Sequence, residues 1–419
     1  MNKVNSFLRR VYDIVAAMLM CIVATYSFSA CSDDDTPSVP PPYADSRIVM
    51  VYMVAENNLN GSATADVGEM LVGMNNDSLY AGDKLVIYLD DVNLPRIYVV
   101  DKTTKKTLLS EIEPIWEYDE DVNSSSPTQL KTFIDFVTTN YPADSYGLVM
   151  WSHASGWIPS TYIGDHSREI QSMRRSFGVD NGRNTSNINN GANIGHQMEI
   201  SEMADALQGY SFDFIFFDAC LMQNIEVVYE LRNTTQYIIA SPAEIPAPGA
   251  NYKTMMKAMF RKDDYVDQML SAYENEYRNT YGLVISAVNT SGLDDFAAYM
   301  KMIVDEHQSD LLALNASSML NYMRWGQWRT DYPDGLDMQG VMLEILNEEE
   351  YAAWKEEADK IFTCVQNGRW YSAYKKKNEI DAAQCCGVSM FIPFDKYGSY
   401  SFKDAYWDTS WAKAVWIKE

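Results

Sequence analysis

Two residues stand where a thiol and an imidazole could work together. His153 follows the apolar run GLVMW, and Cys220 follows the apolar run FDFIFF. The chain has 419 residues and only four histidines, so few side chains could act as a general base near neutral pH. A cysteine thiolate is a strong nucleophile, and a neighbouring imidazole can share its proton and later protonate a leaving amine. Taken singly, Cys220 is more simply a core residue and His153 a structural one, but their matching positions after two strand-like runs favour catalysis.

The segments that position this pair are predicted to be strands of one sheet. Short apolar runs rich in β-branched and aromatic residues alternate with segments of helical periodicity. We expect buried strands at Ile48–Val54, Lys84–Leu89, Gly147–Trp151, Phe212–Phe217 and Tyr237–Ala240. This alternation predicts an α/β fold with a mostly parallel sheet flanked by helices. The carboxyl ends of neighbouring parallel strands share one edge, which would bring His153 and Cys220 together.

Helices are predicted between the strands and over much of the C-terminal half. A helix that begins near Asn224 would direct its positive end toward Cys220 and favour the thiolate. After Tyr252 the pattern is mostly helical, with strand-like runs at Gly282–Val288 and Gly387–Phe391. We divide the chain into a signal segment (1–30), an acidic and proline-rich linker (31–46), a catalytic domain (47–260) and a mainly helical C-terminal elaboration that packs on the same sheet (261–419).

Composition and motifs exclude several other functions. The net charge of −25 argues against nucleic acid as a partner, because phosphates would be repelled. The sequence has no G-x-S-x-G nucleophile elbow, no H-E-x-x-H zinc motif and no phosphate-binding P-loop. Cys364, Cys385 and Cys386 lack the spacing of a zinc site, so we expect no metal and no other cofactor. A calcium requirement stays open: Asp180-Asn181-Gly182 and Asp331 to Asp337 are acidic, but neither fits a twelve-residue calcium loop.

The first thirty residues have the pattern of a bacterial targeting segment. Basic residues precede an apolar run from Ile14 to Val23, and SFSAC follows, in which Cys31 resembles the lipid-modified cysteine of a lipoprotein. The apolar run is shorter than the ~20 residues that span a bilayer. We expect an outer-membrane lipoprotein anchored through lipid on Cys31. The acidic stretch SDDD after this cysteine favours display at the cell surface.

Several segments resemble the clostripain family of cysteine peptidases. The block FFDACLM around Cys220 is the most specific, and EVVYELR and YIIAS follow it. The blocks VYMVAENNL and WSHASGW, the latter around His153, support the resemblance, which covers roughly residues 47–252 with a weaker similarity at GVSMFIP. The resemblance implies a caspase-like fold, His153 as base, Cys220 as nucleophile, and cleavage of proteins or peptides after arginine or lysine. It also implies that Asp218 lines the pocket for that basic side chain, although Asp218 could instead be a structural carboxylate that caps the following helix.

The sequence departs from the family's pattern at two points. Ala154 stands where the family usually has glycine, and its backbone N–H is expected to form the oxyanion hole with that of Cys220. Alanine retains this N–H but would be strained if the position required a positive φ. Pro242-Ala243, followed by Glu244, replaces acidic residues that the family tends to carry there. These departures leave two alternatives open: a peptidase of the same fold with a different P1 preference, such as an acidic residue or asparagine, and a non-catalytic surface binding protein.

A polar stretch between the two candidate catalytic residues carries arginines but no lysine. Residues 165–195 are rich in turn-forming residues and poor in apolar ones, which predicts an exposed loop. A peptidase selective for basic residues would find these arginines close to its own cleft. Clostripain-like enzymes are cut between the two catalytic residues, and we predict self-cleavage here with Arg175 as the candidate site. Alternatively, the loop is a surface insertion and the enzyme works uncut. We expect the protein to be a monomer.

Overall fold

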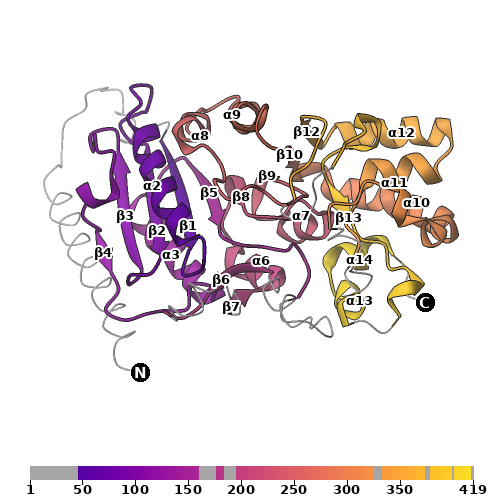
Figure 1. The fold of residues 1–419 in the computed structure, drawn as a ribbon, viewed down its shortest axis with the longest axis horizontal. Helices are drawn as coiled ribbons and strands as arrows, with labels where there is room; N and C mark the ends of the chain where they lie inside the picture. Colours follow the sequence, from indigo (N-terminus) through magenta and orange to yellow (C-terminus); the bar gives the residue numbers. More distant parts are fainter. Residues whose placement is uncertain are drawn as a thin grey trace, which may run out of the picture. The chain divides into compact units, whose positions relative to one another are not determined.

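A nine-stranded sheet forms the centre of the computed structural model (Figure 1). In spatial order its strands are β12 (Phe362–Gln366), β10 (Val284–Asn289), β9 (Thr235–Ala240), β8 (Phe212–Asp218), β5 (Ser145–Trp151), β1 (Arg47–Val54), β2 (Lys84–Asp90), β3 (Arg96–Asp101) and β4 (Trp116–Glu117). The five strands from β9 to β2 run parallel, and those added at either edge run antiparallel. The sheet is therefore mixed, with the predicted parallel sheet at its core.

The structure describes residues 46–159, 176–183, 195–323, 333–372, 378–398 and 401–416. All of them belong to one unit, Tyr43–Glu419. No helix in these ranges is long and apolar enough to cross a bilayer. Cys31 and Arg175 lie outside the described residues, so lipid attachment and self-cleavage stay predictions.

The strands carry continuous apolar runs because both faces of the sheet are covered by helices. On β5, Leu148 and Met150 join the core on one face, whereas Val149 and Trp151 join the core on the other. One face is covered by α2 (Asn60–Met74), α8 (Tyr252–Met259) and α9 (Tyr265–Tyr277). The opposite face is covered by α3 (Pro127–Asn140), α6 (Ile200–Leu207), α7 (Ile225–Leu231) and α10 (Leu293–Ala313), together with α11 (Met338–Ile345), α12 (Glu348–Asp359), α13 (Ser401–Tyr406) and α14 (Ser410–Val415).

Two small sheets and five short 3₁₀ turns complete the described part of the chain. The sheets pair β6 (Phe177–Asp180) with β7 (His196–Met198), and β11 (Leu336–Asp337) with β13 (Ser389–Met390). The turns are η1 (Leu109–Glu111), η2 (Thr290–Gly292), η3 (Ala316–Ser318), η4 (Ala382–Gln384) and η5 (Asp395–Tyr397). The strand predicted at Gly387–Phe391 is thus only the short β13, which lies outside the main sheet.

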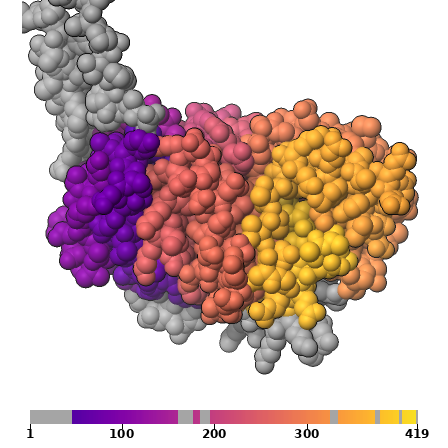
Figure 2. All heavy atoms as spheres, turned by 90° about the horizontal axis from the view of Figure 1, so that it is seen from above, coloured from indigo at the N-terminus to yellow at the C-terminus, as the bar shows by residue number. Residues whose placement is uncertain are grey.

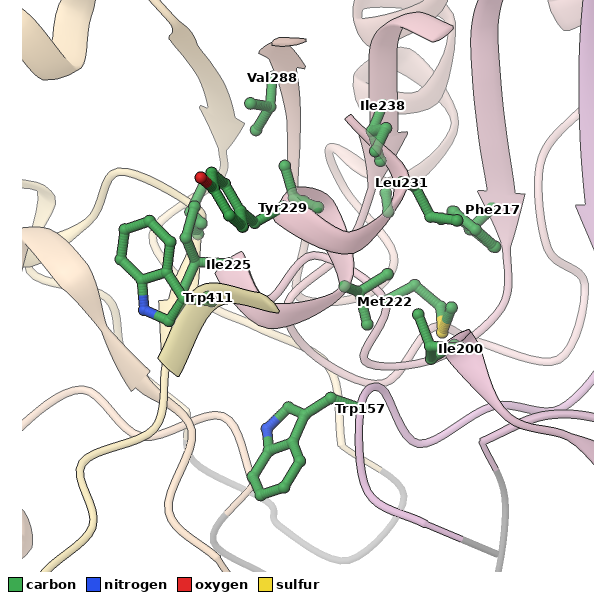
Figure 3. Close-up of a cluster of buried hydrophobic side chains, with 14 of the residues drawn as sticks. Trp157, Ile200, Phe217, Met222, Ile225, Tyr229, Leu231, Ile238, Val288 and Trp411 are labelled. Atoms are coloured by element: carbon green, nitrogen blue, oxygen red, sulfur yellow. The ribbon is translucent and has the colours of Figure 1, made fainter. Parts of the chain in front are cut away.

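The C-terminal part of the chain packs directly against the sheet and its helices. Strands β10 and β12 extend the sheet beyond β9, and the C-terminal segments lie against the middle of the chain when the molecule is seen from above (Figure 2). Trp411 of α14 packs edge-on against Tyr229 of α7, with ring centroids 5.5 Å apart. Figure 3 shows this contact beside Ile225 and Met222, within the apolar cluster that fixes α7 and the chain leading into it.

Candidate active site

His153 and Cys220 follow the neighbouring parallel strands β5 and β8, at equivalent positions in the strand register. In the β5–β8 register, Trp151 pairs with Asp218, and each candidate residue lies two positions beyond its member of that pair. Both side chains are half-buried. The carboxyl edge of the sheet therefore carries the two residues side by side, as the strand pattern predicts.

The His153 ring is held by a residue from a third strand end. Asn58 follows β1, and its Oδ1 lies 2.6 Å from His153 Nε2. An amide oxygen can only accept, so this arrangement assigns the proton to Nε2. The backbone is fixed as well, because the His153 carbonyl accepts from the Gly178 N–H (2.9 Å) and the Ser152 hydroxyl donates to the Val54 carbonyl (2.7 Å). Asn58 thus acts as a positioning residue for the imidazole.

The Cys220 sulfur is contacted by the loop that follows β9. The backbone N–H of Ile245 donates to Sγ at 3.4 Å. Such a donor favours the thiolate, because it stabilises the charged form of the group. Helix α7 begins at Ile225, close to the predicted start, but the Asn224 side chain caps it by accepting from the Val227 N–H at 3.2 Å. The N–H group that contacts the sulfur therefore comes from the loop after β9. The prediction had instead expected the amino end of the helix near Asn224 to face the sulfur.

The turn that follows Cys220 has a strained backbone, and the loop after β9 holds it by hydrogen bonds. Leu221 has a φ of 61°, in the left-handed region that side chains other than glycine rarely occupy. Its N–H donates to the Ala243 carbonyl at 2.9 Å, and the Gln223 N–H donates to the Ser241 carbonyl at 3.1 Å. The segment in which Pro242-Ala243 departs from the family's pattern thus supports the turn that presents Cys220.

The other described cysteines are poorly suited to attack a substrate. Cys385 and Cys386 are buried and Cys364 is half-buried, and all three are free thiols. The neighbouring Cys385 thiol and burial raise the pKa of Cys364, and burial raises the pKa of Cys386 well above its usual value. The remaining described histidines, His196 and His307, lie on β7 and α10. Of the described cysteines, only Cys220 stands beside a histidine at the carboxyl edge of the sheet.

The Ala154 backbone is compatible with the predicted oxyanion hole. Ala154 forms an isolated antiparallel bridge with Phe177 that uses the Ser155 N–H and the His153 carbonyl. The bridge leaves the Ala154 N–H available. Ala154 is not among the described residues with positive φ, so alanine in place of glycine introduces no left-handed strain.

Asp218 is a buried carboxylate with one oxygen unpaired. Its Oδ2 accepts from the Ala250 N–H (3.1 Å) and from the Tyr252 hydroxyl (2.8 Å), whereas Oδ1 is buried and accepts from no described residue. Burial raises the pKa of Asp218 to about 6, and these two donors oppose the rise. Gly249, with a φ of +62°, lies so close that a Cβ there would stand 2.7 Å from Oδ2.

An acidic pocket opens beside this carboxylate. It has a volume of about 360 Å³ and lies between α2 and the loop before α8. Its wall includes Asp66, Glu69 and Glu276, with Gly249 on the side of Asp218. Asp66 accepts from the Trp151 indole N–H at 2.8 Å, while burial and then the charge of Asp218 raise the pKa of Asp66 to about 9. The pocket is thus lined by carboxyl groups and adjoins the loop that covers Asp218.

The sequence model of the clostripain family, peptidase family C11, matches residues 51–417. The chain belongs to the clostripain family. This match runs from β1 through α14 and includes both His153 and Cys220. The resemblance seen in the sequence is confirmed, and so, at the level of the family, is the prediction of a cysteine peptidase.

Known members of the family align over different shares of the chain. Clostripain from Hathewaya histolytica is 28% identical over 226 residues, which are 49% of this chain and 40% of clostripain. An inactive zymogen of a C11 protease from Parabacteroides distasonis is 28% identical, with a TM-score of 0.73, and the match covers 90% of this chain and 100% of that one. A secreted C11 cysteine protease from Bacteroides thetaiotaomicron, solved with an irreversible peptide inhibitor, is 28% identical with a TM-score of 0.70 over 88% and 98% of the two chains. These structures confirm the predicted caspase-like fold.

Three residues of this family member's site were not predicted from the sequence. Asn58 and Ile245 reach the imidazole and the sulfur from loops, and Asp66 enters the pocket wall from α2. The block VYMVAENNL contains Asn58 just after a predicted strand. The position of Asn58 at the same sheet edge as His153 could therefore have been predicted. Nothing in the local sequence marks Ile245, because it acts through its backbone.

Proposed function

We propose that this protein is a cysteine endopeptidase that works through a His153–Cys220 dyad. The observation that carries the proposal is the register of β5 and β8, which brings both residues to one edge at the same height. The Cys220 thiol gives its proton to the other ring nitrogen of His153, Nδ1, and the resulting thiolate attacks the scissile carbonyl. The imidazolium passes that proton to the leaving amine, while its Nε2 proton stays in the hydrogen bond to Asn58. Water then attacks the thioester, with His153 taking its proton, and releases the acid with the free thiolate.

The tetrahedral intermediate would be stabilised by two backbone N–H groups. The Ala154 bridge with Phe177 leaves its N–H unused, and the second donor is the N–H of Cys220. The braced turn at Leu221 supports this role, because fixed donors require no reorganisation when charge develops. Turnover of a peptide panel by the wild type, Cys220→Ala and His153→Ala tests the dyad, and each variant should lose activity while its Tm stays within a few degrees. Substantial turnover by a folded Cys220→Ala protein would end this assignment.

For the substrate we propose arginine or lysine at P1, with Asp218 as the selecting acid. The unpaired buried Oδ1 supports this, since a buried carboxylate without a partner is costly and a cationic guest would relieve it. Glu69 and Glu276 in the pocket wall are further acidic groups, whereas the raised pKa of Asp66 keeps that carboxyl protonated near neutral pH. A purely structural Asp218 would instead hold the loop through Ala250 and Tyr252.

The two alternative functions predict different results on a panel of fluorogenic peptides. A peptidase with an acidic or asparagine P1 preference would cleave those members of a fluorogenic panel in preference to arginine or lysine. A non-catalytic surface binding protein would cleave none of them. The absence of positive-φ strain at Ala154 and the N–H contact to Cys220 Sγ both favour a working enzyme over this second alternative.

We also propose self-cleavage at Arg175. One structural relative is an inactive zymogen, which supports a proteolytic activation step. Strands β5 and β8, which precede and follow the loop, are neighbours in one sheet, so the two pieces should stay together after cleavage. Wild-type protein should give two bands on a denaturing gel and one species on a sizing column, and Cys220→Ala should give one band. Cleavage of the Cys220→Ala protein would point to a contaminating protease.

Export and a lipid anchor on Cys31 complete the proposal. The relative from Bacteroides thetaiotaomicron is secreted, and the leader of this chain has the lipoprotein pattern. Labelled palmitate should be incorporated into the wild type but not into Cys31→Ala, which tests the anchor. Protease added to intact cells should digest the protein, which tests surface display. A sizing column on the soluble domain tests the expected monomer.

A further inference from the structure

Two thiols that the proposed mechanism does not use lie against each other in the C-terminal part of the chain. Cys364 is on β12 and Cys385 directly follows η4, and their sulfur atoms are 3.9 Å apart although the residues are 21 positions apart in the sequence. A disulfide has a sulfur–sulfur length of about 2.05 Å, so the sulfurs would have to approach by about 1.9 Å. Rotation about the two Cα–Cβ bonds can cover that distance.

Of the two adjacent cysteines, Cys385 faces this other thiol and Cys386 is directed elsewhere. The Cys386 sulfur lies 3.3 Å from Asp337 Oδ1 and 3.7 Å from the Val388 carbonyl oxygen, both of which accept from its thiol. The Tyr322 hydroxyl donates to Asp337 Oδ2 at 2.8 Å, so at 3.4 Å it can accept from the Cys385 thiol. A bond between the adjacent Cys385 and Cys386 would depart from relaxed disulfide geometry.

The surroundings of the pair favour a disulfide over two thiols. Cys385 belongs to a small apolar cluster with Leu320, Trp370 and Ile380, and Cys364 packs against it. The neighbouring Cys385 thiol and burial raise the pKa of Cys364 well above its usual value. Little thiolate therefore forms in the folded protein, and oxidation is fastest while the chain is still folding. Once formed, a disulfide carries neither a charge nor a proton that the apolar cluster would have to accommodate.

We propose that Cys364 and Cys385 form a disulfide bond in the mature protein. The oxidant is itself a disulfide: one cysteine thiolate attacks one of its sulfurs, which gives a mixed disulfide and releases a thiol. The second cysteine thiolate then attacks the sulfur of the first cysteine and releases the second thiol. The protein loses two protons and two electrons, and the oxidant becomes two thiols. Such bonds persist outside the cytoplasm, so their presence in the cell rests on the proposed export, whereas the pairing itself does not.

The bond would fix the segments that support the turn after the nucleophile. Gly387 has a φ of +73°, and a Cβ there would stand 2.6 Å from Cys364 Sγ. Ser286, the partner of Cys364 on β10, donates from its hydroxyl to the Gly387 carbonyl at 2.6 Å. Gln223 Nε2 donates to the carbonyl and the hydroxyl oxygen of Ser286, both at 3.0 Å. Gln223 belongs to the turn that presents Cys220, so the cross-link lies two contacts away from the proposed nucleophile's support.

Peptide mapping of the full-length Cys220→Ala protein tests the pairing. The chain would be unfolded, refolded in a buffer of reduced and oxidised glutathione, alkylated in denaturant and digested with trypsin, which cuts between the two cysteines at Arg369. We expect one cross-linked pair of peptides through Cys364 and Cys385, lighter by two hydrogen atoms than the separate peptides, with Cys386 alkylated. Recovery of both cysteines in alkylated form, or a cross-link through Cys386, would overturn the proposal. This variant is inactive by design, so the outcome is independent of the peptidase assignment.

Thermal unfolding measures what the bond contributes. Closing a loop between residues 21 positions apart should raise the Tm of the oxidised protein by about 3–5 °C over that of the reduced protein. Cys364→Ala should unfold at the same Tm in oxidising and reducing buffers, and Cys386→Ala, the matched control, should keep the full difference. If Cys364→Ala fails to fold, Cys385→Ala replaces it. An undiminished difference in either of these two variants would refute the pairing.

The state of the pair in the cell is measured on wild-type protein whose thiols are blocked at lysis. Chains recovered from the cell envelope should carry the same cross-link. Free thiols at both positions in those chains would overturn the proposal for the mature protein. Recovery of the chain from the cytoplasm would instead contradict the proposed export, and the refolding experiment then decides whether the two cysteines pair.

Discussion

Replacing Asp218 by asparagine should make the protein more stable and less selective for basic substrates. Asparagine has the same shape, and its Oδ1 can still accept from the Ala250 N–H and the Tyr252 hydroxyl that now contact the carboxylate. What the substitution removes is a fully buried negative charge. The two effects have opposite signs, so a single variant separates a site carboxylate from a structural one.

The stability effect follows from the pKa of Asp218, which burial raises from 3.8 to about 6. A carboxyl group with a raised pKa stabilises the fold below its unfolded pKa and loses that contribution as the pH rises through about 6. At neutral pH the ionised form therefore costs about 3 kcal/mol, from about 1.4 kcal/mol for each pKa unit. Asp218→Asn should recover much of this at pH 7, a rise in Tm of about 3–5 °C, and progressively less below pH 6.

The selectivity effect is measured with paired substrates that differ only at P1. Loss of the buried partner of a cationic side chain costs about 3–5 kcal/mol, so kcat/KM for arginine should fall about a hundredfold or more, and a neutral P1 should change little. In the wild type the ratio of arginine to neutral kcat/KM should fall as Asp218 protonates below pH 6. In Asp218→Asn this ratio should be low and independent of pH.

Scanning calorimetry at pH 7 in a Cys220→Ala background, with the exposed Asp205→Asn as control, measures the stability effect. A lower Tm for Asp218→Asn would mean that the carboxylate holds the loop at Ala250 and Tyr252 more strongly than burial opposes it. Equal loss of activity on arginine and neutral substrates would make Asp218 structural. In that case Glu276, which lines the acidic pocket, would be the next candidate for selecting the P1 residue.

Other expected outcomes concern the dyad, the core and processing. Asn58→Ala should lower kcat about tenfold to a hundredfold with little change in KM, because the imidazole loses its partner at Nε2. An unchanged kcat in steady-state assays would show that Asn58 does not position the imidazole. Trp411→Ala should lower the free energy of unfolding in urea by about 3–5 kcal/mol, since this side chain is fully buried against α7, and a loss below about 1 kcal/mol would contradict that packing. Mass spectrometry of the purified wild type should find a new C-terminus at Arg175, and intact yet active protein would show that no cleavage is needed.

The strands that carry the site could be predicted because their sequences are unambiguous. Runs such as FDFIFF and GLVMW are apolar on both faces, which only a strand covered by helices on each side requires. All five strands from Ile48–Val54 to Tyr237–Ala240 occur near the predicted bounds, and so does β10. The end of each strand then places its next residues at the carboxyl edge, which is how His153 and Cys220 could be paired from sequence.

The elements that were not predicted have weaker local signals. Strand β12, FTCVQ, lies at the edge of the sheet and is only partly buried, so its sequence lacks a continuous apolar run. The run GVSMF is apolar because it is buried, and only Ser389–Met390 forms a strand. Ile245 contacts the sulfur through a backbone N–H that any residue except proline possesses.

The central claim is that Cys220 is the nucleophile, and covalent labelling tests it most directly. The full-length protein would be incubated with a peptidyl chloromethyl ketone that carries arginine at P1, and the adduct located by peptide mass spectrometry. A single adduct on Cys220 is predicted, with Cys364, Cys385 and Cys386 unmodified and no adduct on Cys220→Ala. Loss of activity on labelling while Cys220 remains unmodified, or equal labelling of the Cys220→Ala protein, would contradict the account.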